Sequence, residues 1–288
     1  MTLKEVTIEG DTLPIKTFKL KQMVENPSIV MIAKRGSGKS WVCRAILKHL
    51  DSRGIPGGLI IAKTDKMNPF YSKFFPDLYI HYEYKSDILE KLLYRQEEMQ
   101  NKNVDKAKIG KRVDRRIFLV MDDCLSSKTT WAKDKPIQEM FYNGRHYEIT
   151  FVLTMQFPLG IGPELRCNFD YIFLLAEDFV SNQKRLFDHY AGMFPNFDSF
   201  RSVFLELTSD FGCMVISNRG NRQSFLDKVF CYTAEETNND YIGSKQFIKI
   251  HKINYDTEWS KRKKPLDINE LAARKKKTGS KIQIKRID

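Results

Sequence analysis

The chain has 288 residues, of which 42% are hydrophobic and 12% aromatic, and it carries a formal net charge of +12 at pH 7. This length and apolar content allow a large buried core, which excludes a chain that is disordered throughout and predicts one large domain with or without an appendage. No run of about 18 apolar residues occurs, and the start, MTLKEVTIEGD, lacks the apolar segment of a signal peptide. We therefore expect a soluble, intracellular protein without a membrane partner.

Short β-branched and aromatic runs alternate along the chain with longer helical patterns. Most strand candidates are continuous apolar runs, which are typical of strands buried on both faces; they are 28–33, 58–62, 78–84, 117–122, 149–155, 171–175, 213–217 and 228–232. The helix candidates are 41–50, 86–100, 136–142 and 183–190. The alternation predicts an α/β fold in which helices flank both faces of a mostly parallel sheet.

Composition divides the chain into four segments. An N-terminal segment (1–26) precedes the main domain (27–235), which we expect to end at the polar run AEETNND; a small segment (236–260) and a basic tail (261–288) follow. The cysteines lie far apart, mostly in apolar stretches and with no C-x-x-C spacing, so we expect reduced core residues and no zinc site. They are Cys43, Cys124, Cys167, Cys213 and Cys231.

The first apolar strand leads through KRGSGKS into a helical pattern. This context suits a phosphate-binding loop, because the start of a helix directs free N–H groups and a positive dipole end at an anion. Gly36 and Gly38 would let the backbone curl around phosphate oxygens, Lys39 would reach the β- and γ-phosphates, and the Ser40 hydroxyl would ligate Mg²⁺. The pattern departs from G-x-x-x-x-G-K-[ST] at Ala33, which is small enough for the strand end. The alternative is an ordinary strand-turn-helix with a surface lysine.

The whole loop would hold the nucleotide, ATP. Its residues are Ala33, Lys34, Arg35, Gly36, Ser37, Gly38, Lys39, Ser40 and Trp41. Lys34 and Arg35 resemble the basic loop residues with which some P-loop ATPases contact the γ-phosphate of the same subunit, although partition ATPases have glycine at the position of Arg35. The alternative is that Lys34 and Arg35 are ordinary charged residues on the protein surface without contact to the nucleotide.

Farther along, a basic stretch (101–116) is predicted to be an exposed loop, and the apolar strand after it ends in Asp122 and Asp123. Asp122 would hold Mg²⁺ through water, and Asp123 would act as the general base that polarises the attacking water. Paired aspartates at a strand end also occur as caps of the following helix. The predicted phosphate loop with Lys39 favours the catalytic interpretation of this aspartate pair over the helix cap.

Several of these motifs together resemble a known family. The phosphate loop, the LVMDD strand, FYNGRHYEITFVLTMQF and the P-x-L-R-x-N-x-D pattern of 163–170 are similar to the DNA-packaging ATPases of large double-stranded DNA viruses and virophages. These belong to the FtsK/HerA branch of P-loop motors. The resemblance covers 27–235; Ala33 and the basic tail depart from it. It implies an additional-strand P-loop NTPase fold of the RecA/FtsK/HerA type.

The resemblance also implies roles for residues beyond the loop. Gln156, at the end of the strand 149–155, would contact the γ-phosphate and the lytic water; the alternative is a glutamine that satisfies strand-end backbone groups. Ring motors of this branch complete each active site with an arginine from the neighbouring subunit. Arg145 is the first candidate and Arg166 the second, and either could instead form an interface salt bridge. We assign His146 no catalytic role.

The charge distribution bears on the substrate. Residues 261–288 hold 11 Lys/Arg against 3 Asp/Glu, a net +8 of the total +12. The clusters KRKK and RKKK suit an arm on phosphate backbone, a nuclear-import signal or a solvated tail. This tail and the stretch 102–116 are candidate grips on DNA that do not read base sequence. Because the aromatic residues are scattered rather than arranged for base stacking, duplex DNA is favoured.

We therefore predict an ATP-driven double-stranded DNA translocase that packages a viral genome as a homo-oligomeric ring, with capsid or portal vertex proteins as partners. It would be associated with the virion and lie inside the host cell, in a cytoplasmic viral factory or the nucleus. Alternatives are a helicase or partition-type ATPase, a nucleotide kinase, and a nucleotide-regulated DNA-binding scaffold. Beyond Asp122 and Asp123 the sequence shows no acidic cluster for a two-metal nuclease.

Overall fold

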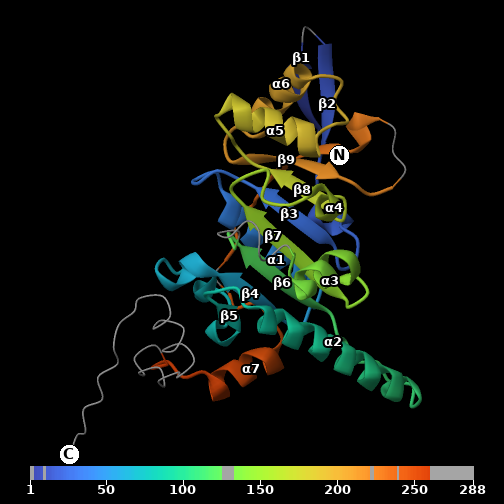
Figure 1. Ribbon diagram of the computed structural model, residues 1–288, viewed down its shortest axis with the longest axis vertical. Helices are drawn as coiled ribbons and strands as arrows, with labels where there is room; N and C mark the ends of the chain where they lie inside the picture. Colours follow the sequence, from blue (N-terminus) through green and yellow to red (C-terminus); the bar gives the residue numbers. More distant parts are fainter. Residues whose placement is uncertain (1–2, 9–10, 125–132, 221–223, 239, 260–288) are drawn as a thin grey trace, which may run out of the picture. The chain divides into compact units, whose positions relative to one another are not determined.

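The computed structural model describes residues 3–8, 11–124, 133–220, 224–238 and 240–259 (Figure 1). Within them, ten strands form one sheet in the order β1-β2-β10-β9-β8-β3-β7-β6-β4-β5. The strands are β1 (Leu3–Ile8), β2 (Asp11–Thr17), β3 (Ser28–Ile32), β4 (Gly58–Ala62), β5 (Ile80–His81), β6 (Ile117–Asp122), β7 (Ile149–Met155), β8 (Tyr171–Leu174), β9 (Gly212–Ser217) and β10 (Val229–Thr233). All neighbours from β8 to β5 are parallel, whereas β9 runs antiparallel to β8.

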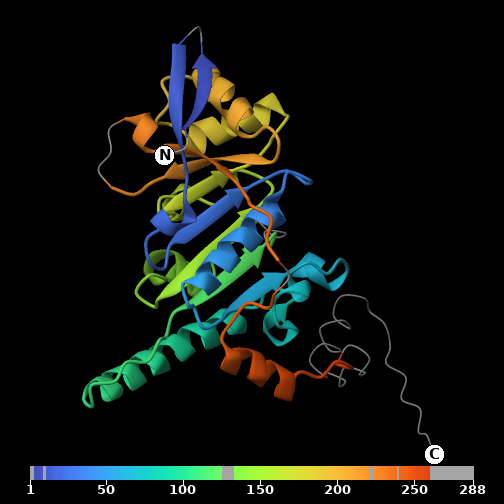
Figure 2. The same cartoon turned by 180° about the vertical axis from the view of Figure 1, so that it is seen from behind.

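Helices cover both faces of the sheet. They are α1 (Lys39–Ser52), α2 (Ser86–Ala107), α3 (Lys135–Asn143), α4 (Pro163–Arg166), α5 (Val180–Tyr190), α6 (Phe197–Leu207) and α7 (Lys245–Asn254). Figure 2 shows α1 lying across the face that is turned away in Figure 1. Side chains of α2, α3, α5 and α6 belong to the core cluster on the opposite face.

The two core clusters follow from the two-residue period of the strands. In β3, Val30 and Ile32 belong to the cluster that contains α2, α3, α5 and α6. Ile29 and Met31 belong to the other cluster, which contains α1. Because both faces are covered, every residue of β6 and of β7 is buried, and each large apolar side chain so buried stabilises the fold by about 1.5–3 kcal/mol.

The predicted α/β class is confirmed, and the strands 58–62, 117–122 and 149–155 have the predicted bounds. The predicted strand 78–84 is largely wrong. Only Ile80 and His81 pair, after a 3-10 turn at Asp77–Tyr79, because the ring of Tyr79 stacks on Phe247 with centroids 3.9 Å apart. The predicted loop 101–116 is partly wrong as well, since α2 continues to Ala107.

Other elements were absent from the prediction, namely β1, β2, α4, α6 and α7. α6 begins where the side chain of Asn196 accepts a hydrogen bond from the Ser199 N–H at 2.8 Å, a typical N-cap. Phe200 and Phe204, one turn apart, are fully buried. Among the cysteines, which are all free, Cys43 and Cys213 are buried but Cys167 is exposed, so the expectation that all lie in the core is wrong for Cys167.

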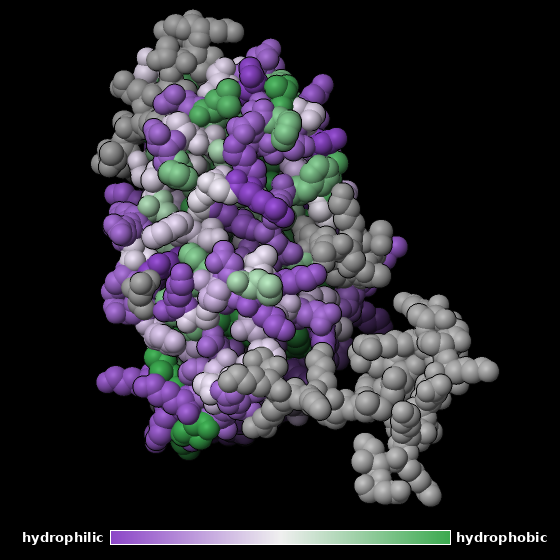
Figure 3. Space-filling model, turned by 90° about the vertical axis from the view of Figure 1, so that its left-hand side faces the viewer, coloured by the Kyte–Doolittle hydropathy of each residue, from purple (hydrophilic) through white to green (hydrophobic). Residues whose placement is uncertain are grey.

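Residues 1–253 form one structural unit and 254–288 another, so the predicted segment 236–260 is divided between them. Within the first unit Ile242 is buried and Phe247 packs against Phe75. Of the second unit only 254–259 are described, and the predicted basic tail lies outside the described residues. In the part of the chain that the structure covers, no helix has the length and apolarity to cross a membrane. The face shown in Figure 3 is mostly hydrophilic, with scattered hydrophobic residues.

Candidate active site

Three neighbouring parallel strands bring the predicted motifs to one edge of the sheet. β7 lies between β3, which leads into the glycine-rich loop, and β6, which ends in Asp122. This inserted strand is the feature expected of an additional-strand P-loop fold. Since the carboxyl ends of parallel strands share an edge, the loop, the aspartates and Gln156 become neighbours.

The loop turns sharply between β3 and α1. Gly36 (φ +77°) and Gly38 (φ +92°) adopt the left-handed conformation that favours glycine. The Ser37 hydroxyl donates to the Lys34 carbonyl at 2.8 Å, and the Ala33 N–H donates to the Met155 carbonyl at 3.0 Å. The loop is thus anchored to β7 and delivers the N-terminus of α1, whose free N–H groups suit an anion.

Lys39, the first residue of α1, joins the loop to both aspartates. Its ammonium lies 3.0 Å from Asp122 Oδ1 and donates a hydrogen bond to Asp123 Oδ2. Burial alone would lower the pKa of Lys39, but the two carboxylates outweigh it and raise the pKa above 10.5. Lys39 therefore carries its charge at neutral pH, in a position to bind phosphate oxygens.

Asp122 is almost fully buried and held by neutral donors as well. The Thr154 hydroxyl donates to Oδ1, and the Tyr71 hydroxyl donates to Oδ2 at 3.1 Å. Burial, together with Cys43 and Asp122, raises the pKa of Tyr71 well above 10, so that it remains a donor. These bonds fix the orientation of the carboxylate.

Asp123 has a conformation that is uncommon for a residue other than glycine, with φ +50°. Its N–H lies 3.3 Å from the Thr154 carbonyl and 3.2 Å from the Thr154 hydroxyl, while Oδ2 accepts a hydrogen bond from Gln156 Nε2 at 2.8 Å. The turn directs the carboxylate toward the loop. Strained backbone of this kind concentrates at functional sites.

These groups line a cavity of about 960 Å³. The predicted site residues that line it are Lys34, Arg35, Gly36, Gly38, Lys39, Ser40, Trp41, Asp122, Asp123 and Gln156. Apolar surface comes from Trp41 and from two residues that the sequence did not point to, Phe70 and Phe211. A cavity with a cationic, hydrogen-bonding end and aromatic walls can hold a nucleotide by both its phosphates and its base.

The donors present suit Mg²⁺. The Ser40 hydroxyl and the Asp122 carboxylate are hard oxygen ligands. Mg²⁺ commonly binds through one or two protein groups together with phosphates and water. Within the described ranges, no cluster of three or more His, Cys, Asp or Glu could hold a metal.

The two candidate arginines lie outside the cavity. Arg145 precedes β7 at the opposite edge of the sheet and pairs with Asp170, with Nη2 2.6 Å from Oδ1. The length of β7, roughly 20 Å, separates this edge from Gln156. Arg166 in α4 lies over the Tyr190 ring at 5.5 Å. Within the loop, Lys34 pairs with Asp178.

Comparisons with known proteins give a family match and relatives from large DNA viruses. The model of the poxvirus A32 protein family matches residues 15–182, which include the loop, both aspartates and Gln156. Protein L437 of Acanthamoeba polyphaga mimivirus is 48% identical over 244 residues, 85% of each chain. Protein 075L of Invertebrate iridescent virus 6 is 30% identical over 241 residues, 83% of this chain and 90% of that one.

A solved structure shows the same fold. B204, the DNA-packaging ATPase from Sulfolobus turreted icosahedral virus, superimposes with a TM-score of 0.53 at 15% identity, over 74% of this chain and 100% of that one. The family match and the viral relatives confirm the resemblance that the motifs predicted. The chain belongs to the poxvirus A32 protein family.

Proposed function

We propose that the protein is an ATPase that moves double-stranded DNA and packages a viral genome into capsids, with hydrolysis at the subunit interfaces of a homo-oligomeric ring. The observation that carries this proposal is the convergence of Lys39, Asp122, Asp123 and Gln156 at one strand edge. A loop lysine alone would suit any nucleotide-binding protein. The carboxylate and amide beside it are the groups that activation of water requires.

ATP would bind with its phosphates in the glycine-rich loop. The N–H groups at the start of α1 and the Lys39 ammonium would neutralise the β- and γ-phosphates. Ser40 and Asp122 would hold Mg²⁺, which supplies further neutralisation of phosphate charge. The base would extend toward Trp41 and Phe211, where the cavity wall is aromatic.

Hydrolysis would use Asp123 and Gln156. Asp123 accepts a proton from water as the water oxygen attacks the γ-phosphorus, and the bond to the β–γ bridging oxygen breaks to release ADP and phosphate. Gln156, already bonded to Asp123, orients that water. Its place at the end of β7 would let the strand respond to loss of the γ-phosphate.

DNA is supported as the substrate by the fold that the chain shares with B204, a DNA-packaging ATPase. Exposed basic residues at and after the end of α2, such as Lys102, Lys106, Lys111 and Arg112, suit contacts to phosphate backbone. Arg145 or Arg166 would reach the active site of a neighbouring subunit. Capsid or portal proteins as docking partners remain a prediction.

The test is ATP hydrolysis by the full-length protein with and without long duplex DNA at matched salt. We expect DNA to stimulate turnover and Lys39→Ala to abolish it, whereas Lys91→Ala, which removes an exposed lysine of α2 paired with Asp87, should hydrolyse ATP normally. Turnover that is indifferent to DNA, or that survives Lys39→Ala, would contradict the proposal.

A further inference from the structure

The second half of α2 projects from the body of the protein (Figures 1 and 2). The buried residues of α2 lie between Leu89 and Gln96, and none of the residues 97–112 is buried. The exposed part of the helix, 97–107, is about 16 Å long at roughly 1.5 Å per residue. We call residues 97–113, which comprise this part and the return of the chain, the finger.

The tip of the finger has a defined structure. Gly110 adopts the left-handed conformation (φ +67°) after the last turn of α2, and the Lys111 N–H donates to the Lys106 carbonyl at 3.0 Å, an arrangement that ends helices. The Asn103 side chain then accepts the Val113 N–H at 3.1 Å. The returning chain is therefore fixed beside the helix, and the two form one hairpin.

The finger concentrates positive charge. Residues 101–112 hold five Lys/Arg against one Asp, a net charge of +4, and residues 261–288 hold +8 of the total +12, so all other residues sum to zero. Of the five cations only Lys108 forms an ion pair with a described residue, with Asp105 at 2.9 Å. The other four are exposed; they are Lys102, Lys106, Lys111 and Arg112. Such cations on a projecting element suit the phosphate backbone of duplex DNA.

Gln96 joins the root of the finger to the turn before β7. It is fully buried, and its Nε2 donates to the Arg115 carbonyl at 2.8 Å and to the Tyr147 carbonyl at 2.6 Å. The Arg115 side chain pairs in turn with Glu148, with Nη2 3.0 Å from Oε1. Buried amides are normally satisfied in this way. Here the two bonds link the helix, the returning chain and the turn at one point.

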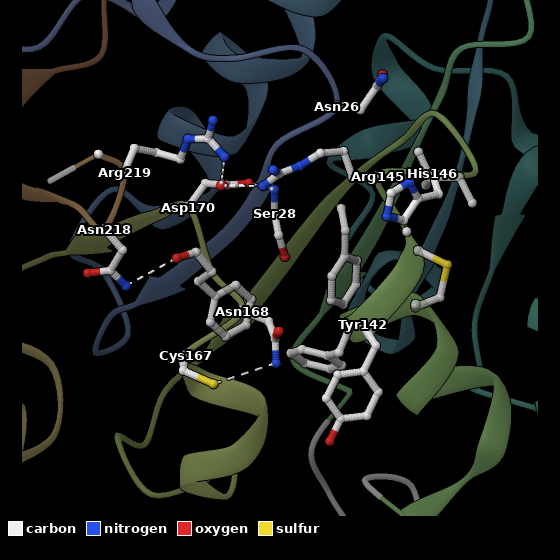
Figure 4. A pocket seen from close by; sticks show the side chains of 17 residues that line it. Asn26, Ser28, Tyr142, Arg145, His146, Cys167, Asn168, Asp170, Asn218 and Arg219 are labelled. Carbon is white, nitrogen blue, oxygen red and sulfur yellow. Dashed lines mark hydrogen bonds and ion pairs between the residues drawn. The ribbon is translucent and has the colours of Figure 1, made fainter.

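The turn before β7 is held on its other side as well. Arg145 donates to Asp170 Oδ1 at 2.6 Å, and Arg219 shares that oxygen at 3.1 Å (Figure 4). Glu148, the last residue before β7, has a left-handed backbone (φ +54°), which is uncommon outside glycine. Strained backbone of this kind concentrates at functional sites and switch regions. The turn thus has one defined position, which a movement of the finger root would change.

β7 connects this turn to the active site. All its residues are buried, and the strand pairs with β3 on one side and β6 on the other, so it shifts as a unit. Directly after its far end, Gln156 donates to Asp123 Oδ2 at 2.8 Å. A displacement at Tyr147 would therefore alter where Gln156 stands relative to the glycine-rich loop.

We propose that the finger grips the backbone of duplex DNA and that Gln96 couples this grip to ATP hydrolysis through β7. Lys106, Lys111 and Arg112 contact phosphates. Gln96 is a positioning residue, because it touches neither DNA nor nucleotide. The inference rests on the proposed function and adds the route by which DNA acts on the active site.

Coupling between two sites is reciprocal. If DNA on the finger favours one position of β7, occupation of the nucleotide site must change the affinity for DNA by the same factor that DNA changes the affinity for nucleotide, about 5–150-fold in typical cases. Two readouts follow: the stimulation of kcat by DNA, and the change in DNA affinity when a non-hydrolysable ATP analogue binds.

The first part of the test removes the grip in the full-length chain. In Lys111→Gln/Arg112→Gln we expect the slope of log K for duplex DNA against log salt to fall in magnitude by about 1.8, since each lost phosphate contact removes about 0.9. Lys73→Gln/Lys184→Gln, at exposed lysines outside the finger, is the control with equal charge change. An unchanged slope in the finger variant would overturn the grip.

The exposed apolar residues of the finger test the other kind of partner, a protein. Val104 is 52% and Ile109 62% exposed. If the finger holds DNA, Val104→Ser/Ile109→Ser should leave the oligomeric state unchanged in sedimentation. Loss of assembly in this variant, together with a normal salt slope in the charge variant, would assign the finger to contact between proteins and overturn the inference.

The second part removes the coupling. Gln96→Met keeps the size of the side chain and removes both donated bonds. We expect normal basal hydrolysis and DNA affinity, but a kcat at saturating DNA that falls to the basal value, and a DNA affinity that no longer responds to the ATP analogue. Gln100→Met, at an exposed residue one turn farther along α2, is the control. Full stimulation in Gln96→Met would overturn the coupling.

A second variant covers the case in which Gln96→Met does not fold. Glu148→Asn breaks the ion pair with Arg115, and asparagine tolerates the left-handed backbone, so the fold should persist while DNA stimulation falls. Unchanged stimulation would again overturn the coupling. A merely structural role would lower stability and basal turnover together and leave the ratio of stimulated to basal kcat unchanged.

Failure of the proposed function looks different from failure of this inference. In the first case, wild-type protein would show no hydrolysis that depends on Lys39, or none that DNA stimulates. Wild-type protein with DNA-stimulated hydrolysis, beside neutral finger and Gln96 variants, would refute this inference alone.

Discussion

The amide of Gln156 donates a hydrogen bond to Asp123 Oδ2 at 2.8 Å, and this bond links the ends of two neighbouring strands. Asp122 in β6 stands opposite Thr154 in β7 in the parallel ladder, so the two strand ends are in fixed register. A change in the ligand that Asp123 contacts would therefore alter the position of the Gln156 side chain, which directly follows β7. The proposed mechanism depends on this contact.

Replacing Asp123 by Asn should separate binding from hydrolysis. Asn tolerates the left-handed conformation and its oxygen can still accept the bond from Gln156, so the fold and ATP binding should persist, but it cannot take a proton from water. We expect the single-turnover hydrolysis rate to fall by about 10²–10⁴-fold, with normal binding of a fluorescent ATP analogue. Asp105→Asn, at an exposed residue paired with Lys108, is the control. Retained hydrolysis would refute the general-base role.

Gln156→Ala should impair hydrolysis and its response to DNA. Loss of the amide leaves the water unoriented, and the removal of one preorganised donor costs on the order of 10²-fold in kcat. Gln156→Glu should be at least as severe, because a carboxylate cannot donate to Asp123 and repels it. Turnover is measured with and without DNA beside Gln100→Ala in α2. A variant that hydrolyses ATP slowly but is still fully stimulated by DNA would exclude a role of Gln156 in passing the loss of the γ-phosphate on to β7.

Thr154→Val tests the support of Asp122. The hydroxyl of this fully buried residue donates to the carboxylate, and loss of a hydrogen bond to a charged group should lower the free energy of unfolding by about 2 kcal/mol. Thr150→Val is a matched change in the same strand, where the buried hydroxyl has no partner among the described residues. It should be neutral or stabilising. Equal urea midpoints for the two variants would contradict the role of Thr154.

Tyr71 predicts a pH dependence of stability. Burial, with Cys43 and Asp122, raises its pKa well above the ordinary value of 10. Below pH 10 the phenol is protonated in the folded and unfolded states; above pH 10 only the unfolded state ionises, so the wild type loses stability. The stability advantage of wild type over Tyr71→Phe should therefore shrink as pH rises above 10. Tyr94→Phe, at a tyrosine 65% exposed, is the control, and its free energy of unfolding should vary with pH as that of wild type does. A difference in unfolding free energy between wild type and Tyr71→Phe that stays constant above pH 10 would contradict the account.

The sequence predicted the site where the motif residues are local. Strand, loop and helix follow one another from Ser28 onward, and the apolar strand that ends at Asp122 is continuous. The sequence therefore placed both the loop and Asp122 at the carboxyl ends of strands, at the same edge of the sheet. Gln156 was found through family resemblance. By contrast, Thr154 lies within an apolar run, and Tyr71 reaches Asp122 from 51 positions away. No local pattern signals either contact.

The errors in the prediction of the fold also have physical causes. Tyr79, Tyr82 and Tyr84 have high strand propensity, but packing of Tyr79 on Phe247, far away in sequence, favours a 3-10 turn. The signal of α6 was present in Asn196 and in the spacing of Phe200 and Phe204. Arg219 meets Asp170 across 49 positions, and only the sheet order reveals that pairing.

The central claim is that ATP hydrolysis drives movement along duplex DNA, and displacement of a third strand from a DNA triplex tests it most directly. The full-length protein should release the third strand in the presence of ATP, and neither the Lys39→Ala protein nor wild type with a non-hydrolysable analogue should do so. DNA-stimulated hydrolysis without any displacement would contradict translocation and indicate an ATPase that binds DNA without moving along it.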